Sequence, residues 1–419
     1  MKLVYRLLVI TLCSFATYAD TLSIKQQQAW LEDINFFENQ VRTKHIEPFH
    51  TLAENDFARL LKELKQDLPL LSEPQVEARL MAITGAIGDG HSNYFMMSGP
   101  HQHFPLRYKF FDNKLHVIDA TKPYQHLIGA ELKTINGLTV EGLFELITPL
   151  LPGIDNQFSA KTRFEFYLTL HKLLLGLGLI KESAAAQFEF ELGGNTLNEQ
   201  IIPVAMSEFA KLSSAFKNHS DKFNMLDIGM PGISLNLLKE NKVAYFDFNA
   251  YPSFEQVIAK CKALLKQLKA AKSKYLIIDF RGNGGGSFYN GLAFSSCLLP
   301  LDQFDWKAGV FVLTDEHTFS AAMSNTVQFK QILNARIFGT PTGGDPNQFS
   351  ESYRFVLPNS KRKLSVSKRY YPFLFEDTDA VYPDELIETS WLDYQQGNDT
   401  VLSAVLTEIE KIENNTCSN

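Results

Sequence analysis

Residues 279–286 read DFRGNGGG and place a glycine-rich loop directly after an apolar run. The run, at residues 275–278, is typical of a strand buried on both faces. Gly284, Gly285 and Gly286 have no side chains, so a ligand can approach the loop backbone closely. Backbone N–H groups at the end of a buried strand suit a phosphate or the oxyanion of an acyl-transfer intermediate. A phosphate is disfavoured because the loop lacks both GxGxxG and a Gly-Lys-Ser/Thr ending; a tight turn without a ligand is the alternative.

A serine lies among small residues in the segment TFSAAM, residues 318–323. The preceding GVFVL, residues 309–313, predicts a strand and a helical pattern follows, so Ser320 is expected at a strand-to-helix junction. At such a junction the hydroxyl is accessible, and the N–H of Ala321 points toward developing negative charge. The alternative is that Ser320 only caps the helix.

A histidine stands beside glycine in the segment GDGHS, residues 88–92. A capping box at Ser72 and apolar residues at helical spacing predict a helix that ends just before this segment. The neighbouring glycines allow a sharp turn that presents the His91 ring. Histidine titrates near neutrality, so the ring can accept and return the proton of a serine hydroxyl. The alternative is that His91 bonds only a carbonyl at the helix end.

Composition bounds the class of protein. The chain has 419 residues, enough for two or three domains, and its hydrophobic content of 45% fits a well-cored globular protein. The formal net charge is −7 without a block of like charges, which argues against binding to nucleic acid. No Cys-x-x-Cys or Cys/His spacing indicates a metal site, and no cofactor is expected.

The first 19 residues are predicted to be a secretory signal peptide. Lys2 and Arg6 precede a short apolar stretch, and residues 17–19 offer a small-residue cleavage site. No later segment is long and apolar enough for stable membrane insertion. We therefore expect a periplasmic or secreted protein.

Cysteines are few for an exported protein. Signal cleavage leaves three of them, Cys261, Cys297 and Cys417. Because three is an odd number, at least one is unpaired or pairs between chains. Stability is accordingly expected from the hydrophobic core rather than from disulfides.

The predicted elements divide the rest of the chain into three regions. Helical spacing dominates residues 24–90, and strand and turn patterns alternate with two helices in residues 104–205. Strand–helix alternation in the last part is typical of an α/β domain. The predicted domains are 1–19 for the signal peptide, 20–103 for a helical region with His91, 104–205 for a small mixed module and 206–419 for the α/β catalytic half.

Together these segments resemble the tail-specific, or C-terminal processing, serine peptidases, and more closely their tricorn-like branch. The resemblance extends from about residue 75 to the end, and five motifs carry it: GDGHS at 88–92, DFRGNGGG at 279–286, TFSAAM at 318–323, GTPTGG at 339–344 and VYPD at 381–384. It implies a crotonase-like αβ-spiral catalytic domain preceded by an N-terminal helical region and a PDZ-like α+β module. TINGLTVEGL at 134–143 resembles the signature turn of that module.

The resemblance also implies roles for single residues. Ser320 is the nucleophile, and the oxyanion hole is formed by the N–H of Ala321 and that of Gly285 or Gly286. The processing branch takes its base from a lysine in the stretch that here reads GTPTGGD, residues 339–345, and no lysine is present there. The tricorn-like branch uses a histidine as its base, and His91 lies at the corresponding position in this sequence.

A carboxylate precedes the V-x-P-D segment in this branch. Here Glu376 and Asp377 both precede it; counting back from Pro383 favours Asp377, and residue type favours Glu376. Asp89 is a second candidate for orienting His91.

The implied function is that of an exported serine peptidase. It hydrolyses peptides or unfolded proteins through a Ser320 acyl-enzyme, with His91 as general base and no cofactor. The PDZ-like module would dock an extended peptide by strand addition. Two alternatives share the scaffold: a non-catalytic binding protein for peptides or apolar ligands, and a crotonase-like acyl-thioester enzyme that would not need Ser320.

Overall fold

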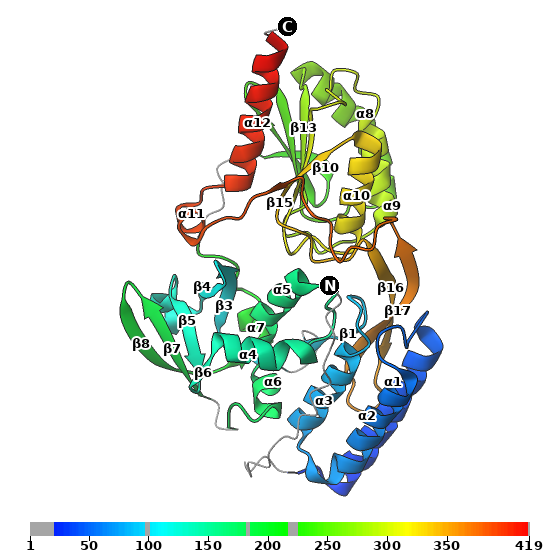
Figure 1. Cartoon of the computed structure of the whole chain (residues 1–419), viewed down its shortest axis with the longest axis vertical. Helices are drawn as coiled ribbons and strands as arrows, with labels where there is room; N and C mark the ends of the chain where they lie inside the picture. Colours follow the sequence, from blue (N-terminus) through cyan, green and yellow to red (C-terminus); the bar gives the residue numbers. More distant parts are fainter. Residues whose placement is uncertain (1–20, 97–100, 182–184, 217–224, 418–419) are drawn as a thin grey trace. The chain divides into compact units, whose positions relative to one another are not determined.

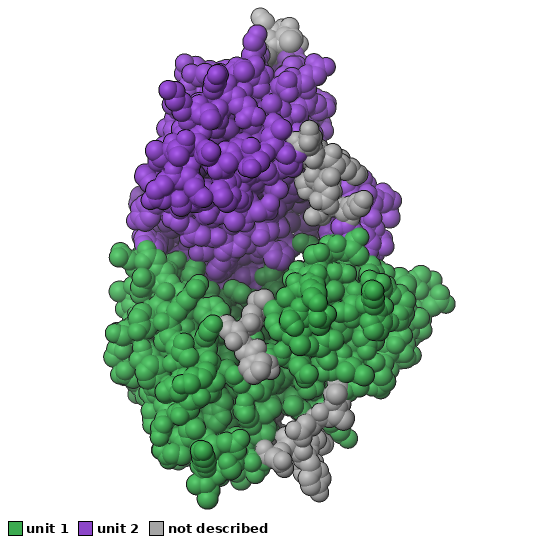
Figure 2. Space-filling model, turned by 180° about the vertical axis from the view of Figure 1, so that it is seen from behind, with its two compact units in different colours: residues 1–154, 160–215, 349–370 green, residues 155–159, 216–348, 371–419 purple. Residues whose placement is uncertain are grey.

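The computed structural model describes residues 21–96, 101–181, 185–216 and 225–417 (Figure 1). The predicted signal peptide lies outside the described residues. The chain forms two compact units, coloured separately in Figure 2. Unit 1 comprises residues 1–154, 160–215 and 349–370, and unit 2 comprises residues 155–159, 216–348 and 371–419.

Unit 1 begins with the predicted helices. They are α1 (Ile24–Lys44), α2 (Glu54–Asp67) and α3 (Glu73–Gly85), with a 3-10 turn η1 (Leu68–Leu70) between the last two. The capping box expected at the start of α3 is present, and the Ser72 N–H donates to Gln75 Oε1 at 2.9 Å. Bonds of this kind satisfy backbone groups that have no partner inside the helix. The chain then turns through the segment that contains His91.

The mixed module of unit 1 is built on an antiparallel sheet. Its strand order is β3-β4-β5-β7-β8, and a short β6 pairs with β5. A tight turn joins β3 to β4, with positive φ at Asp112 and Asn113 as such a hairpin requires. The elements are β3 (Leu106–Phe111), β4 (Lys114–Ala120), η3 (Lys122–Leu127), β5 (Glu131–Ile135), β6 (Leu138–Thr139), α4 (Val140–Ile147), η4 (Thr148–Leu150), α5 (Gln157–Tyr167), α6 (His171–Gly176), β7 (Ala186–Leu192) and β8 (Asn195–Ile201).

Two smaller sheets complete unit 1. One joins β2 (Gln102–His103) to β9 (Val204–Ala205), which leads into α7 (Met206–Phe209). The other has the order β1-β17-β16. Its strands are β1 (Asn93–Tyr94), β16 (Asn347–Val356) and β17 (Lys363–Pro372). β16 and β17 form a hairpin late in the chain, and this hairpin pairs with the short strand just after His91, although more than 250 residues separate them in the chain.

Unit 2 is a mixed α/β unit around a seven-stranded sheet. The order is β10-β11-β12-β13-β14-β15-β18, antiparallel as far as β12 and parallel from there on. The strands are β10 (Leu226–Met230), β11 (Ile233–Leu238), β12 (Val243–Phe248), β13 (Tyr275–Asp279), β14 (Val310–Thr314), β15 (Arg336–Gly339) and β18 (Glu385–Leu386). The alternation expected from the sequence is therefore confirmed.

Helices cover both faces of this sheet (Figure 1). α8 (Phe254–Ala271), α9 (Phe288–Leu298) and α10 (Ala321–Leu333) pack on one face with Leu276 and Ile278 of β13. α12 (Thr400–Cys417) packs on the other face with Tyr275 and Ile277, after the short α11 (Trp391–Gln396). Every residue of β13 is buried, as the apolar run predicted.

A disulfide joins α8 to α9. It links Cys261 to Cys297, whose Cα atoms lie 5.7 Å apart. No spacing rule pairs these two cysteines, and the expectation that stability comes from the core rather than from disulfides is corrected by this bond. The covalent loop that it closes contains β13 and the glycine-rich loop.

Among the residues with described positions, no helix combines the length and apolar character that crossing a bilayer requires.

Candidate active site

Three chain segments meet at one edge of the unit 2 sheet. β13, β14 and β15 are neighbouring parallel strands, so their carboxyl ends lie side by side. The segments that follow them are residues 280–287, 315–320 and 340–346. Ligand sites in α/β sheets form outside such strand ends. The glycine loop, Ser320 and the GTPTGG motif are brought together in this way.

Hydrogen bonds connect the first two segments directly. The Asp315 Oδ1 atom accepts the N–H groups of Gly282 at 2.9 Å and Thr318 at 3.1 Å. The Phe319 N–H donates to the Asn283 carbonyl at 3.0 Å. One carboxylate oxygen of Asp315 and one backbone bond therefore fix the spacing between the glycine loop and the residues just before Ser320.

Ser320 has a strained backbone at the start of α10. Its φ and ψ are 52° and −122°, a conformation that costs a residue with a side chain about 1–3 kcal/mol. Its side chain makes no capping hydrogen bond to the helix, so the structure does not support Ser320 as a simple cap. Ala321 is the first residue of α10, and its N–H has no acceptor within the helix. A serine on a strained strand-to-helix turn is the arrangement of an exposed nucleophile.

Gly285 lies directly against Ser320. A Cβ built on Gly285 would stand 2.6 Å from the Ser320 Cβ and 3.0 Å from the Ala321 nitrogen. Gly285 also has a φ of 103°, which favours glycine. Its own N–H donates to Asn283 Oδ1 at 2.9 Å. Gly286 follows against the ring of Tyr251, which a Cβ there would approach to 2.5 Å.

The GTPTGG motif packs behind the serine. A Cβ on Gly344 would lie 3.3 Å from the Ser320 nitrogen, and the Gly343 N–H donates to the Thr318 carbonyl at 3.1 Å. The next residue, Asp345, stands in the stretch where the processing branch has its lysine. Burial raises the pKa of Asp345 to about 6; a hydrogen bond from the Asn347 N–H opposes this shift, and the nearby carboxylates of Asp379 and Asp377 add to it.

The two candidate carboxylates, Glu376 and Asp377, are both exposed. The backbone carbonyl of Glu376 accepts a hydrogen bond from Asn347 at 2.9 Å. The carboxylate of Asp377 is close enough to Asp345 to raise the pKa of that residue. Both residues thus lie beside the segment that packs behind Ser320.

Asp279 and Arg281 anchor the glycine loop from behind. The Arg281 Nε donates to Asp279 Oδ1 at 2.9 Å, and its Nη1 donates to Asp399 Oδ1 at 2.8 Å. The Tyr245 hydroxyl donates to Asp279 Oδ2 at 2.7 Å. Asp279 is buried, and its pairing with Arg281 gives both residues a structural role beside the glycine loop.

His91 lies in unit 1, after α3. Asp89 accepts the His91 backbone N–H at 2.9 Å and the Ser92 N–H at 2.7 Å, so it orients the backbone of His91. Burial alone would raise the pKa of Asp89. The hydrogen bond and charge of His45, together with hydrogen bonds from Ser367 and Ser92, outweigh the effect of burial and lower the pKa to about 2. Asp89 is therefore an ionised support for this turn.

The His91 ring is neutral near pH 7. Burial lowers its pKa to about 4, and the charge of Asp89 only partly opposes this shift. The Ser350 hydroxyl lies 3.4 Å from the His91 Nε2 atom, and Ser365 Oγ donates to the His91 carbonyl at 2.7 Å. Both serines come from the late hairpin. A neutral imidazole is the form that accepts a proton.

Sequence reasoning did not find three supporting residues: His45 and Ser350, which lie near His91 in unit 1, and Asp315, which bonds to the glycine loop in unit 2. The His45 Nε2 atom lies 2.9 Å from Asp89 Oδ2, from 44 residues away in the chain. Asp315 is a polar residue in a loop and Ser350 is a residue of β16, and neither stands out from its neighbours in the sequence. No local pattern marks these positions, because each contact depends on the path of the chain within its own unit.

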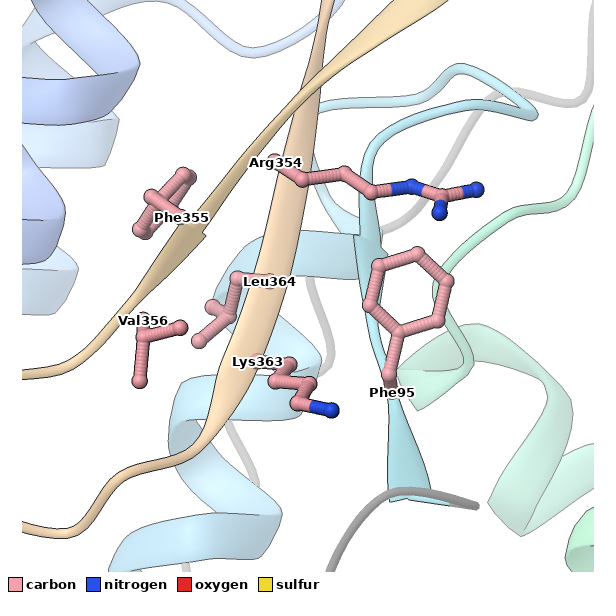
Figure 3. Close-up of a pocket in the computed structure, with 6 residues that line it drawn as sticks. All are labelled: Phe95, Arg354, Phe355, Val356, Lys363 and Leu364. Carbon is pink, nitrogen blue, oxygen red and sulfur yellow. The ribbon is translucent and has the colours of Figure 1, made fainter.

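Unit 1 also has a pocket with a volume of about 260 Å³ on the β1-β17-β16 sheet (Figure 3). The Arg354 guanidinium lies over the Phe95 ring, 5.7 Å from its centre. The lining residues are Phe95, Arg354, Phe355, Val356, Lys363 and Leu364. Neither His91 nor Ser350 lines it.

Comparison with known protein families identifies the unit 2 segment. A model of peptidase family S41 matches residues 242–304, from the start of β12 through the glycine loop and α9. These residues match peptidase family S41. The resemblance to the tail-specific serine peptidases is thereby confirmed, and the chain is a serine-type peptidase. A comparison with curated protein sequences gives no match.

Two solved structures are similar in fold to nearly the whole chain. A crystal structure of a CPAF mutant has a TM-score of 0.60 and 13% identity, covering 88% of this chain and 95% of that one. Mature CPAF complexed with lactacystin has a TM-score of 0.59 and 12% identity, covering 93% and 98%. At such identities the likeness is one of fold.

Proposed function

We propose that Ser320 is the nucleophile and His91 the general base of an exported enzyme that hydrolyses peptides or unfolded proteins. The observation that carries this proposal is the packing of Gly285 against a strained Ser320 at the first turn of α10. That arrangement sets a hydroxyl beside backbone N–H groups, which is what acyl transfer requires.

The proposed oxyanion hole uses the N–H of Ala321 and a glycine of the loop. Gly285 donates its N–H to Asn283, which favours Gly286 as the loop donor. Donors fixed in this way stabilise the negative oxygen of a tetrahedral intermediate by about 3–4 kcal/mol each.

The reaction then follows from the two residue types. The Ser320 Oγ attacks the peptide carbonyl carbon while the neutral His91 accepts its proton. The tetrahedral intermediate collapses, His91 returns the proton to the leaving amine, and an acyl-enzyme on Ser320 remains. Water, deprotonated by His91, releases the acyl group. The Glu376–Asp377 pair is the proposed source of the site carboxylate.

His91 and Ser320 belong to different units, so their pairing is inferred from each residue's own surroundings. The absence of lysine from residues 339–345 and the neutral state of His91 both support the histidine-using, tricorn-like version.

We assign residues 20–103 to a helical region, 104–205 to a PDZ-like module that docks peptide by strand addition, and 206–419 to a crotonase-like catalytic domain. Turn sequence and antiparallel pairing in the module support its assignment. The Cys261–Cys297 disulfide supports export, because disulfides persist in oxidising compartments.

A serine-directed fluorophosphonate tests the nucleophile. Wild-type protein is expected to gain one adduct, mapped to Ser320 by peptide mass spectrometry, and to digest fluorescein-labelled unfolded casein. Ser320→Ala and His91→Ala should lose both properties, while Ser296→Ala, at an exposed serine of α9, should keep them. Casein digestion that persists in Ser320→Ala would refute the assignment, and a folded wild type with neither property would indicate a binding protein.

A further inference from the structure

Three potential metal ligands lie together just before Ser320. Asp315, Glu316 and His317 each offer one ligand atom, and these three atoms lie within 4.8 Å of one another. The His317 Nδ1 atom is 3.7 Å from Asp315 Oδ2 and 3.8 Å from Glu316 Oε1. These separations are too long for hydrogen bonds. They are close to those around a shared ion, since ligand atoms about 2.1 Å from a metal lie roughly 3.0–3.5 Å apart.

The remaining carboxylate oxygens are held by other groups. Asp315 Oδ1 accepts three backbone N–H groups, from Gly282, His317 and Thr318, at 2.9–3.1 Å. Glu316 Oε2 accepts the Thr340 hydroxyl at 3.1 Å. Each carboxylate therefore has one oxygen fixed by a donor and the other turned toward the His317 ring. Hydrogen-bonded ligands of this kind are typical of metal sites.

The cluster is open to solvent. The side chains of His317, Glu316 and Asp315 are 37%, 22% and 18% exposed, so an ion can enter and complete its coordination with water. One imidazole and two carboxylates suit Zn²⁺ better than Ca²⁺ or Mg²⁺, which prefer oxygen ligands alone.

We propose that Asp315, Glu316 and His317 form a Zn²⁺ site in the loop that precedes the nucleophile. This inference goes beyond the proposed function and does not depend on it. The ion takes no part in the reaction. It links the three side chains of residues 315–317, the segment that bonds to Gly282, and so makes the connection between the glycine loop and Ser320 more rigid.

Calorimetric titration of ZnCl₂ into untagged mature protein, dialysed against EDTA and then buffer, tests the site. The Ser320→Ala background excludes self-digestion and separates metal binding from catalysis. We expect one Zn²⁺ per chain, with affinity lowered about 10- to 100-fold in His317→Ala and in Glu316→Gln. The matched control is His126→Ala, which removes an exposed histidine that contacts Glu199, and it should bind like the parent.

Thermal unfolding gives a second readout. Zn²⁺ should raise the midpoint of the parent protein and of His126→Ala, but not that of His317→Ala, because only a folded-state site couples binding to stability. The proposal is overturned if the parent binds Zn²⁺ no more tightly than His317→Ala. Tight binding of Mn²⁺ with no binding of Zn²⁺ would overturn the assignment to zinc.

Discussion

The Cα of Gly285 faces the Ser320 side chain so closely that no other residue fits at position 285. A Cβ there would stand 2.6 Å from the Ser320 Cβ and 2.8 Å from the Phe319 carbonyl oxygen. The glycine next to it, Gly284, has open space on its side-chain face. Two adjacent glycines therefore differ in how much they determine the candidate site.

Gly285→Ala is expected to abolish peptidase activity and to lower the free energy of unfolding by about 2–4 kcal/mol. The new methyl group overlaps Ser320, and alanine is strained at a φ of 103°. Gly284→Ala is the matched control, and its effect on stability should stay within about 0.5 kcal/mol. Urea unfolding and casein digestion measure the two effects. Equal losses in both variants would contradict the close approach of Gly285 to Ser320.

Ser320→Gly is expected to stabilise the protein while removing activity. Glycine takes the φ of 52° without strain, and the gain of about 1–3 kcal/mol exceeds the entropy that glycine adds to the unfolded chain, about 0.4–1 kcal/mol. Ser320→Ala keeps the strain and serves as the comparison. A higher urea midpoint for the glycine variant than for the alanine variant is the expected outcome; equal midpoints would count against strain at this residue.

Activity should persist to lower pH than an ordinary histidine allows. With a pKa of about 4, His91 stays neutral down to roughly pH 5, whereas a histidine with its usual value near 6.5 would be mostly charged there. The acid limb of kcat/KM is therefore expected below pH 5. Asp345→Asn is the control, because Asp345 is a second group near the serine that titrates in this range. An acid limb near pH 6.5 in both proteins would contradict the low pKa of His91.

Asp345 should make stability depend on pH between about 4 and 6. Its folded pKa of about 6 is above the ordinary 3.8, so its protonated form stabilises the fold. That contribution is complete below pH 4 and is lost as the pH rises through 6. Relative to Asp345→Asn, the wild type should lose about 1–2 kcal/mol over this range, after allowance for partial exposure. Urea unfolding at pH 4.5 and pH 7.5 measures the difference; Asp302→Asn, at an exposed carboxylate, should show none.

Replacing both Cys261 and Cys297 by serine should lower the free energy of unfolding by about 3–4 kcal/mol. The bond spans 36 residues, and closing a loop of that length reduces the entropy of the unfolded chain. Dithiothreitol should destabilise the wild type by a similar amount and leave the double variant unchanged. A wild type that is insensitive to the reductant would argue that the cysteines do not pair in solution.

The sequence predicted the α/β unit because its strongest signals are local. β13 is a run of apolar residues that ends at a charged one, and such a strand has few alternatives. The positions of Ser320 and the glycine loop followed from the same logic, since each comes directly after a buried strand. The packing of Gly285 on Ser320 could not be predicted from neighbouring residues in the sequence. The three adjacent glycines indicated only that another group approaches the loop backbone closely.

Contacts across long stretches of chain could not be predicted. Cysteine connectivity depends on the chain path, so the Cys261–Cys297 pair carried no signal. The contact of Ser350 with His91 spans 259 residues, and no spacing rule connects a late hairpin to an early turn. For the same reason the choice between Glu376 and Asp377 depends on side-chain surroundings that motif counting does not supply.

The polar residues at the end of β13 have a further consequence for strand register. Because β13 is apolar on both faces, sliding it by two residues along β12 would leave its burial pattern unchanged. Such a slip would carry Gly285 about 6.6 Å away from Ser320, at roughly 3.3 Å per residue. The hydrogen bond from Tyr245 of β12 to Asp279 of β13 fits only one alignment of the two strands. Hydrophobic burial thus makes the sheet stable, whereas this buried polar group makes its alignment unique, and with it the place of the glycine loop.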